Sequence, residues 1–358
     1  MKAKKRVVVV GAGIIGASIA WHLAKAGADV TVLEAAQAGG VATAASFAWL
    51  NASWGNPEPY FHLRQRSLRE WTRLAGEVPG LPLAWTGGLC LDMADAEREA
   101  YRKLHAAWGY DIRPIGRDEA ARLEPNVRDL PEEALFAAEE GMAEPVAAAR
   151  ALLADAERHG ARLVIDDPVV AFARSGDRLT GAVTASATWD ADEIVLAAGI
   201  ATGRLAALVG VEFVLDTPPG LIVHSRPHAR ILNGIVLAPG LHMRQTAGGR
   251  VIAGADFGGG DPGADEGATA GALFETLKAA LKGGEALQLD FHTVGRRPTP
   301  KDGFPAVGRA VNGLYLAVTH SGMTLAPALG LFAAEEIVRD RRDPLLAPYA
   351  PSRFAGSA

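Results

Sequence analysis

The sequence GAGIIG at residues 11–16 constrains this chain more than any other feature. Gly11 permits a tight turn, Gly13 lets a pyrophosphate approach the backbone, and Gly16 lets a helix pack closely on a strand. The N-terminus of that helix then points free N–H groups and its positive dipole end at the phosphates. The spacing predicts a turn that binds a dinucleotide, and by itself it does not decide between FAD and NAD.

The residues around this turn complete a βαβ unit. An apolar run at 6–10 predicts a buried parallel strand, and 17–26 predicts a helix that ends at Gly27. A second strand is predicted at 29–34, and Glu34 closes it. The carboxylate of this residue can accept hydrogen bonds from a ribose diol. The strand, the helix and the acidic residue follow one another in the order of a dinucleotide-binding unit. This order favours a dinucleotide-binding turn over an ordinary glycine turn.

Composition and charge narrow the class of protein. The chain has 358 residues, 49% hydrophobic and 22% charged, which suits a large core and two domains. Its net charge of −5 and lack of a long basic run argue against nucleic-acid binding. Cys90, the one cysteine, cannot form an intramolecular disulfide, and we expect no metal site. The basic and then apolar residues at the N-terminus imitate a signal peptide, but the glycines of the turn interrupt them. No apolar run of about 18 residues predicts a membrane span, so we expect a cytoplasmic protein.

The middle of the chain changes from one pattern to another. A helix from Pro145 to Gly160 and a strand at 193–197 continue the parallel α/β pattern. Between Leu221 and Gly254, short strands joined by Gly and Pro predict a separate antiparallel sheet. We therefore expect an α/β fold, with a discontinuous Rossmann-type domain and a second, mainly antiparallel-sheet α+β substrate domain. The expected limits are 1–80, 145–216 and 296–358 for the first domain, and 81–144 and 217–295 for the second.

The last part returns to the α/β pattern. We predict a strand at 313–318, a turn at 319–324 and a helix at 326–339. Pro327 suits the first turn of this helix, because its missing N–H is no loss there. A helix start of this kind presents unpaired N–H groups and a positive dipole end, which can stabilise negative charge.

Several separated segments resemble one known family, the D-amino acid oxidase-like FAD-dependent oxidoreductases, which include glycine oxidase and monomeric sarcosine oxidase. The matching segments are VVVVGAGIIGASIAWHLAKAGADVTVLE (7–34), ASFAWLNAS (45–53), GMAEPVAAARALLADAERHGA (141–161), IVLAAG (194–199), GRRPTPKDGFPAVGR (295–309) and HSGMTLAPALG (320–330). They stand in the family's order and span nearly the whole chain. The resemblance implies FAD rather than NAD, held noncovalently because the last third of the chain has no cysteine.

The resemblance and the glycine turn together give a set of expected FAD-binding residues. In this set, Ser46 is expected near phosphate and Val169 near the adenine. The first turn of the last helix is expected under the flavin ring. The full set is Gly11, Gly13, Ile14, Ile15, Gly16, Glu34, Ala35, Ala45, Ser46, Val169, Ala198, Gly199, Gly322, Met323, Thr324 and Leu325.

The expected catalytic residues are Arg297, His320 and Trp49. The resemblance implies that Arg297 grips a substrate carboxylate, to which a guanidinium offers two parallel donors. Arg296 is the second choice, and an interdomain or surface ion pair is the alternative for either arginine. His320 can hydrogen-bond to substrate or flavin, or serve the structure alone. Trp49, with Phe47 and Asn51 in the same loop, either walls the pocket or packs between domains.

These residues predict oxidation of an amino acid or secondary amine. Hydride passes from the carbon next to nitrogen to flavin N5, and the resulting imine hydrolyses. The alternatives are FAD-dependent oxidation of a hydroxy acid or polyol, an NAD-dependent dehydrogenase, and a noncatalytic nucleotide-sensing or assembly module. Sarcosine oxidase has a lysine thought to assist oxygen where this chain has Gly258–Gly260, so the acceptor is oxygen or another oxidant. Substrate identity, stereochemistry and oligomeric state stay open.

Overall fold

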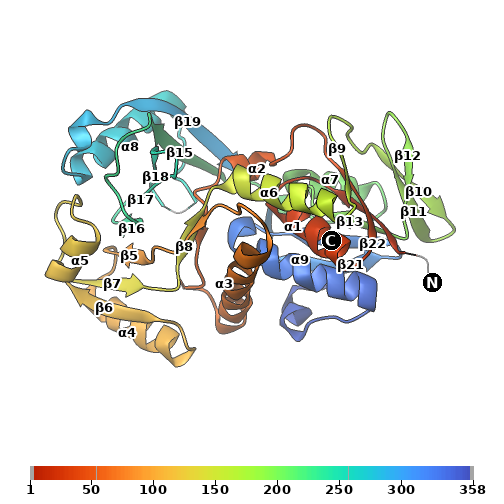
Figure 1. Cartoon of the computed structure of the whole chain (residues 1–358), viewed down its shortest axis with the longest axis horizontal. Coiled ribbons are helices and arrows are strands. Elements are labelled where there is room, and N and C mark those ends of the chain that lie inside the picture. Colours follow the sequence, from red (N-terminus) through yellow and green to blue (C-terminus); the bar gives the residue numbers. More distant parts are fainter. Residues whose placement is uncertain (1–3, 54, 257, 355–358) are drawn as a thin grey trace.

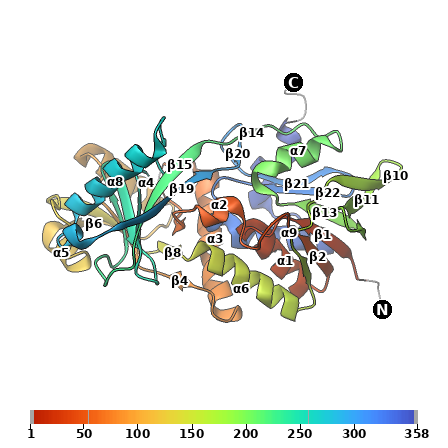
Figure 2. The same ribbon diagram turned by 90° about the horizontal axis from the view of Figure 1, so that it is seen from above.

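The computed structural model describes residues 4–53, 55–256 and 258–354. The ends of the predicted first domain, residues 1–3 and 355–358, lie outside this part, as does Trp54 in the loop after Trp49. Figures 1 and 2 show two lobes that lie side by side along the longest axis of the molecule. Both termini belong to the same lobe (Figure 1).

A six-stranded sheet forms the centre of the lobe that holds the termini (Figure 1). Its strands, in sheet order, are β21 (Ala306–Val311), β22 (Leu314–Val318), β13 (Glu193–Leu196), β1 (Arg6–Val10), β2 (Asp29–Leu33) and β9 (Arg162–Val164). Neighbours from β22 to β9 are parallel, and only the edge strand β21 runs antiparallel. The strands predicted at 6–10, 29–34, 193–197 and 313–318 therefore lie side by side in one sheet with β1 near its middle, as expected of a Rossmann-type domain.

Both faces of this sheet are buried, which explains why β1 reads as a continuous apolar run. Val7 and Val9 pack into the core on one face, whereas Val8 and Val10 pack into a second core on the other. Figure 2 shows helices α1, α6 and α9 on the first face and helix α7 with strands β10 and β11 on the second. Alternation along an extended chain produces this division, because successive side chains point to opposite faces.

The helices of the first face come from distant parts of the chain. Helix α3 packs on α9 and extends this layer. The four helices are α1 (Ile14–Lys25), α3 (Glu58–Glu77), α6 (Pro145–Arg158) and α9 (Gly322–Arg339). The second face is covered by α7 (Thr202–Ala207) and by the sheet of β10 (Ala171–Ser175), β11 (Arg178–Val183) and β12 (Thr188–Asp190).

The other lobe contains an eight-stranded, mainly antiparallel sheet. Its order is β19 (Leu289–Arg296), β15 (Pro219–Ser225), β18 (Val251–Gly254), β17 (Leu241–Gln245), β16 (Ile235–Ala238), β5 (Gly88–Cys90), β7 (Glu133–Ala137) and β6 (Ile112–Gly116). Strands β16 and β5 pair in parallel and so join two segments that are far apart in sequence. The predicted antiparallel sheet is therefore present, while the residue limits of the two domains stay a prediction.

Short elements complete the two lobes and the region between them. A small sheet of β3 (Trp49–Leu50), β8 (Gly141–Ala143) and β4 (Leu83–Ala84) connects the lobes. The remaining helices are α2 (Val41–Ala44), α4 (Asp95–Ala107), α5 (Arg117–Leu123) and α8 (Glu266–Ala280). The other short elements are the pair β14 (Leu215–Asp216) and β20 (Thr299–Pro300), and 3₁₀ turns at Gly199–Ala201, Gly284–Ala286, Pro344–Tyr349 and Pro351–Phe354.

Two helices begin earlier than their sequence patterns predict. Helix α1 starts at Ile14 rather than at residue 17, directly after the turn at Gly13. Helix α9 starts at Gly322 rather than at residue 326, so half of the predicted turn is helical and Pro327 lies inside the helix. In both helices the first turn contributes to the core and to the cavity at once, since Ile14 and Met323 are buried core residues that also line the cavity described below.

Close packing of α1 against α9 gives a prediction for Gly330. A Cβ atom on Gly330 would overlap the Ser18 hydroxyl and lie 2.6 Å from His22 Nδ1. We expect Gly330→Ala to lower the free energy of unfolding by about 1–3 kcal/mol, since overpacking must push the helices apart. Gly271→Ala is the matched control, because nothing lies near a Cβ there and alanine favours helix by about 1 kcal/mol. Urea unfolding curves measure both changes; equal stability of the two variants would contradict the prediction.

Candidate active site

A cavity of about 430 Å³ runs from the glycine turn to the segment that joins β19 to β20. It lies at the carboxyl ends of β1, β13 and β22, whose last or following residues Val10, Ala197 and Val318 line it. Strand β1 has β2 on one side and β13 on the other, so the connections that leave these strands diverge. Ligands of doubly wound sheets bind in the crevice that such a divergence leaves.

The glycine turn has the geometry that the sequence predicts. Gly11 has a φ of +107°, and a Cβ atom on it would lie 2.5 Å from Ala197 O. A Cβ atom on Gly16 would overlap Gly11 O, so the backbone of α1 rests directly on the turn. The nearest atoms to a Cβ on Gly13 are Thr43 Oγ1 and Gly40 Cα, at 3.4 and 3.8 Å. The turn therefore leaves the start of α1 open toward the cavity.

Glu34 lines the same end of the cavity and holds the surrounding backbone in place. One carboxylate oxygen accepts the N–H of Ala12 at 2.7 Å, and the other accepts that of Ala36 at 3.1 Å. The Thr43 hydroxyl accepts the N–H of Ile14 at 3.2 Å, where the helix has no side-chain cap of its own. Sequence reasoning missed this threonine. The glycine pair shortly before it, Gly39 and Gly40, was an available signal, because both have positive φ and the backbone there passes close to the glycine turn.

Most of the predicted FAD-binding residues come together around this cavity. The lining includes Gly11, Gly13, Ile14, Ile15, Glu34, Ala35, Ala45, Ser46, Val169, Ala198, Gly199, Gly322, Met323 and Thr324. Two predicted residues do not line it. Gly16 lies beneath the turn and acts through packing, as described above. Leu325 is buried in the core and donates its N–H to Ser321 O, so neither its side chain nor its N–H is directed to the cavity.

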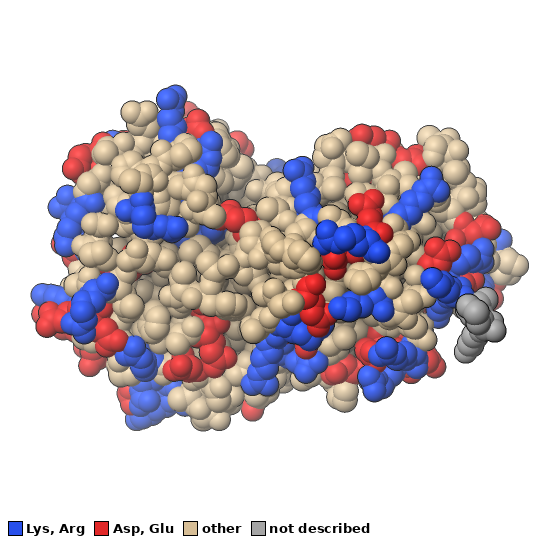
Figure 3. Space-filling model, in the orientation of Figure 1, with Lys and Arg blue, Asp and Glu red and all other residues tan. Residues whose placement is uncertain are grey.

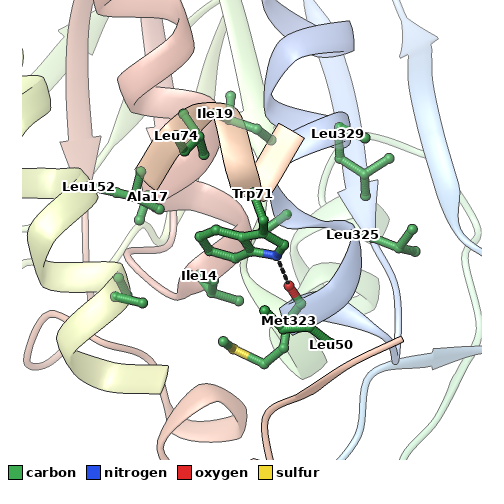
Figure 4. Close-up of a cluster of buried hydrophobic side chains, with 14 of the residues drawn as sticks. Ile14, Ala17, Ile19, Leu50, Trp71, Leu74, Leu152, Met323, Leu325 and Leu329 are labelled. Carbon is green, nitrogen blue, oxygen red and sulfur yellow. Dashed lines mark hydrogen bonds between the residues drawn. The ribbon is translucent and has the colours of Figure 1, made fainter. Parts of the chain in front are cut away.

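The start of α9 forms one wall, and Trp71 of α3 stabilises it. Pro327 has no N–H, so it cannot bond to the carbonyl four residues earlier, Met323 O. The Trp71 indole donates to this carbonyl at 2.8 Å instead (Figure 4). Trp71 is completely buried among apolar side chains such as Ile14 and Leu329 (Figure 4). The proline that looked like a helix start therefore creates a free acceptor, which a neighbouring helix satisfies.

The predicted catalytic residues Arg297 and His320 lie at the other end of the cavity. Arg297 is half-buried, and its Nε has no hydrogen-bond partner among the described residues. A Cβ on Gly258 would overlap its guanidinium, so the glycine makes room for it. Burial, together with the charges of Arg64 and Arg297, lowers the pKa of His320 to about 4, and its Nδ1 has no described partner. The imidazole of His320 is therefore neutral near pH 7. Arg296, the second choice for the carboxylate, also lines the cavity but is exposed.

Trp49 lines the cavity from β3, and a buried carboxyl group holds its ring. The Trp49 indole donates to Glu140 at 2.8 Å, and the hydroxyls of Ser53 and Tyr110 donate to the other oxygen at 2.8 and 2.9 Å. Burial raises the pKa of Glu140 to about 7, although these hydrogen bonds and the charge of Arg64 oppose the rise. Glu140 is thus a positioning residue for the cavity wall. Sequence reasoning missed it because it lies 91 positions after its indole partner.

Arg64 of α3 is a further lining residue that the sequence did not reveal. Its exposed fraction is 5%, and its guanidinium is fixed by three hydrogen bonds. Nε and Nη2 donate to the main-chain and side-chain oxygens of Asn51 at 3.1 and 2.7 Å. Nη1 donates to the Ser321 hydroxyl at 2.8 Å. On the helix pattern alone, this arginine is one of several cations and nothing marks it as buried.

Acidic and basic side chains are interspersed over both lobes on the face that Figure 3 shows. Within the described residues, no group of His, Cys, Asp or Glu side chains is arranged to hold a metal ion. None of the helices in that part of the chain has the length and apolar character to cross a membrane.

Comparison with known proteins identifies similar chains over the whole length. A family model described as FAD dependent oxidoreductase matches residues 6–336. Glycine oxidase of Bacillus licheniformis is 29% identical over 353 residues, which cover 94% of each chain.

Solved structures give the same picture. The structure of glycine oxidase from Geobacillus kaustophilus is 25% identical with a TM-score of 0.86, covering 99% of this chain and 100% of that one. Iminodiacetate oxidase from Chelativorans sp. BNC1 is 27% identical with a TM-score of 0.82, covering 97% and 99%. Both lobes are therefore shared with these proteins.

The raised pKa of Glu140 predicts a pH dependence of stability. Its folded pKa of about 7 exceeds the ordinary value of 4.5, so its contribution to stability is complete at low pH and is lost as pH rises through 7. When the pH is raised from about 5 to about 8, we expect the free energy of unfolding of the wild type to fall by about 1–3 kcal/mol more than that of Glu140→Gln. Urea unfolding at both pH values measures the difference. Parallel pH profiles of the two proteins would show that the carboxyl group does not titrate in this range.

Proposed function

The chain belongs to the family of FAD dependent oxidoreductases, and on that premise we propose that it oxidises an amino acid or a secondary amine. When bound, FAD supplies a flavin ring that accepts a hydride from the carbon next to nitrogen and leaves an imine, which water hydrolyses. The observation that carries the proposal is the half-buried guanidinium of Arg297, which lines the cavity and has an Nε without a described partner. The similar proteins named for glycine and iminodiacetate oxidation act on compounds that carry such a carboxylate.

The geometry of the cavity also supports a proposal for the end that would bind FAD. The open turn at Gly11 and Gly13 and the start of α1 would hold the pyrophosphate. Glu34 would accept hydrogen bonds from the adenosine ribose, and Val169, another lining residue, would contact the adenine. The first turn of α9 would place its N–H groups and positive dipole end at the flavin. A flavin that gains negative charge on reduction would be stabilised there.

Arg297 would bind and orient the substrate. Two parallel N–H donors fix both the position and the direction of a carboxylate, which would hold the reacting carbon in one place. The positive charges of Arg297 and Arg64 would also favour the neutral form of the substrate amine, because like charges disfavour its protonated form. A neutral amine has the lone pair that imine formation requires. Neutral His320 is available as a hydrogen-bond partner, and the ring of Trp49, held by Glu140, would exclude water.

Two finer assignments complete the proposal. The segment at 258–260 contains no lysine that could assist the reaction with oxygen. We therefore propose that either oxygen or another electron acceptor reoxidises the flavin. We also propose a cytoplasmic location, in keeping with a single buried cysteine, Cys90.

We further propose that FAD is held noncovalently. Cys90 is buried in the substrate-lobe strand β5 and does not line the cavity. Burial also raises the pKa of its thiol to about 12, so it has little nucleophilic thiolate. We expect acid precipitation of the yellow protein to leave the flavin in the supernatant, as absorbance measures. Yellow colour that stays with the precipitated protein would show a covalent bond.

A substrate panel tests the proposed reaction together with the role of Arg297. The flavin absorbance is followed without oxygen while sarcosine, glycine, dimethylamine, hydroxy acids and polyols are added, and air or a dye then reports the acceptor. We expect amino acids to bleach the flavin, and reduction by hydroxy acids or polyols alone would overturn the proposal.

In the same assay, we expect Arg297→Gln to raise the KM for sarcosine about 30-fold or more, because loss of one partner of a buried charge pair costs about 2 kcal/mol or more. The KM for dimethylamine should rise much less, since this amine has no carboxylate and loses only the effect of the charge on its nitrogen. Arg296→Gln is the comparison, because Arg296 is adjacent, exposed and the second choice for the same role. A larger effect of Arg296→Gln than of Arg297→Gln would reassign the carboxylate to Arg296.

A further inference from the structure

Arg64 is a buried cation that faces the cavity without a carboxylate partner among the described residues. Its exposed fraction is 5%, yet no ion pair within that part of the chain includes it. Other arginines on the same helix are neutralised: Arg66 and Arg73 lie 2.9 and 2.6 Å from the carboxylate of Glu70. Burying a charge without a counter-charge lowers the stability of a protein. The position of Arg64 is therefore better explained by an anionic ligand or by the cofactor than by stability.

The orientation of Arg64 leaves part of its guanidinium available. An arginine has five N–H donors. Three are used in the bonds to Asn51 and Ser321, one each from Nε, Nη1 and Nη2. One N–H on each terminal nitrogen therefore remains without a described partner. The three acceptors are neutral oxygens and the Tyr60 ring, 5.4 Å from the guanidinium carbon, is uncharged, so the direction of the group is fixed while its charge has no carboxylate partner.

The second guanidinium of the cavity, that of Arg297, is also close enough to His320 for its charge to act on the imidazole. Arg64 bonds to Ser321, the residue after this histidine, and the charges of both arginines act on the imidazole. Arg297 comes from the segment after β19 and packs against Gly258, whereas Arg64 comes from α3. The two cations therefore line one cavity from segments that are far apart in sequence.

Negative charge to match these two cations is missing from the cavity itself. Glu34 is the one carboxylate among its described lining residues, and it lies at the opposite end, bonded to the backbone of Ala12 and Ala36. Glu140 is near enough to feel the charge of Arg64, but it is bonded to Trp49, Ser53 and Tyr110 and makes no ion pair with Arg64. Two fixed positive charges without a protein counter-charge form a site for two anionic groups.

We propose that the substrate is an amino or imino dicarboxylate, with one carboxylate on Arg297, the other on Arg64 and the reacting C–N bond between them. This inference rests on the proposed amine oxidation and specifies its substrate class. The reaction itself is unchanged: hydride leaves the carbon next to nitrogen, and the second carboxylate takes no part in bond breaking. Arg64 is then a specificity-determining residue, which selects dianions over the corresponding monocarboxylates.

Iminodiacetate and sarcosine provide a matched pair of substrates, since they differ only by the second carboxylate. We expect the wild-type enzyme with FAD to reduce its flavin with a kcat/KM about 10-fold or more higher for iminodiacetate than for sarcosine, as a charge-assisted bond in a buried site predicts. Arg64→Gln should lower the value for iminodiacetate about 10- to 100-fold more than it lowers the value for sarcosine, because both substrates lose the effect of the charge on the amine but only iminodiacetate loses a carboxylate partner. Arg64→Lys should fall between the two, because it keeps the charge but loses the fork of donors. Arg69→Gln, which removes an exposed cation from the same helix, is the control.

Binding without turnover tests the site independently of the reaction. Succinate and butyrate, which have equal chain length but two and one carboxylates, are titrated while the flavin absorbance reports occupancy. We expect tighter binding of succinate to the wild type and loss of that preference in Arg64→Gln. Equal dissociation constants for the two acids in the wild type would overturn the inference even if no variant folds.

The other outcomes are distinct. Equal losses for iminodiacetate and sarcosine in Arg64→Gln, with a shift of the flavin midpoint potential, would mean that Arg64 acts on the flavin and would overturn the dicarboxylate assignment. Flavin reduction by sarcosine as efficient as that by iminodiacetate would overturn it while leaving amine oxidation intact. Failure of every amine to reduce the flavin would overturn the proposed function, and a retained preference for succinate would still support a site for two anions.

Discussion

The close contact of helix α1 with the backbone around it is the constraint on which the rest of the structure depends. At its start, no side chain separates Gly16 from the turn at Gly11, and farther along Gly330 of α9 rests against Ser18. Side chains at these glycines would hold the segments apart. Because they are absent, the starts of α1 and α9 approach each other and open into one cavity. Two helix N-termini thus present their positive ends to a single ligand site.

Electrostatics divides this cavity into two ends. At the glycine turn, the carboxylate of Glu34 is available to a ribose, and the phosphates would meet helix N–H groups rather than cations. At the other end, Arg64 and Arg297 create a positive field in a partly dry environment, and His320 stays neutral within it. Such a field favours carboxylates and a neutral amine and disfavours an ammonium group. The same field would support negative charge on a flavin ring bound in this cavity.

A layer of buried polar contacts holds the cavity walls without touching the ligand site directly. Trp71 satisfies the carbonyl of Met323 that Pro327 leaves without a partner, and Glu140 holds the Trp49 indole. Each contact joins segments that are far apart in sequence, so the wall formed by one segment depends on a residue from another. Buried donors and acceptors need such partners, because an unmet one costs about 1–3 kcal/mol. The precision of the site is therefore a property of the packed protein as a whole.

The sequence by itself determined the βαβ opening, the doubly wound sheet, the antiparallel second sheet and most of the cavity lining at Gly11, Glu34 and the start of α9. These features follow from periodicity and from backbone conformations that only glycine adopts easily, and both are local properties of a chain. Tertiary structure alone decided that Arg64, Thr43 and Glu140 belong to the site and that Leu325 does not. Burial and partnership of a side chain depend on which distant segments pack around it, and no local pattern encodes that choice.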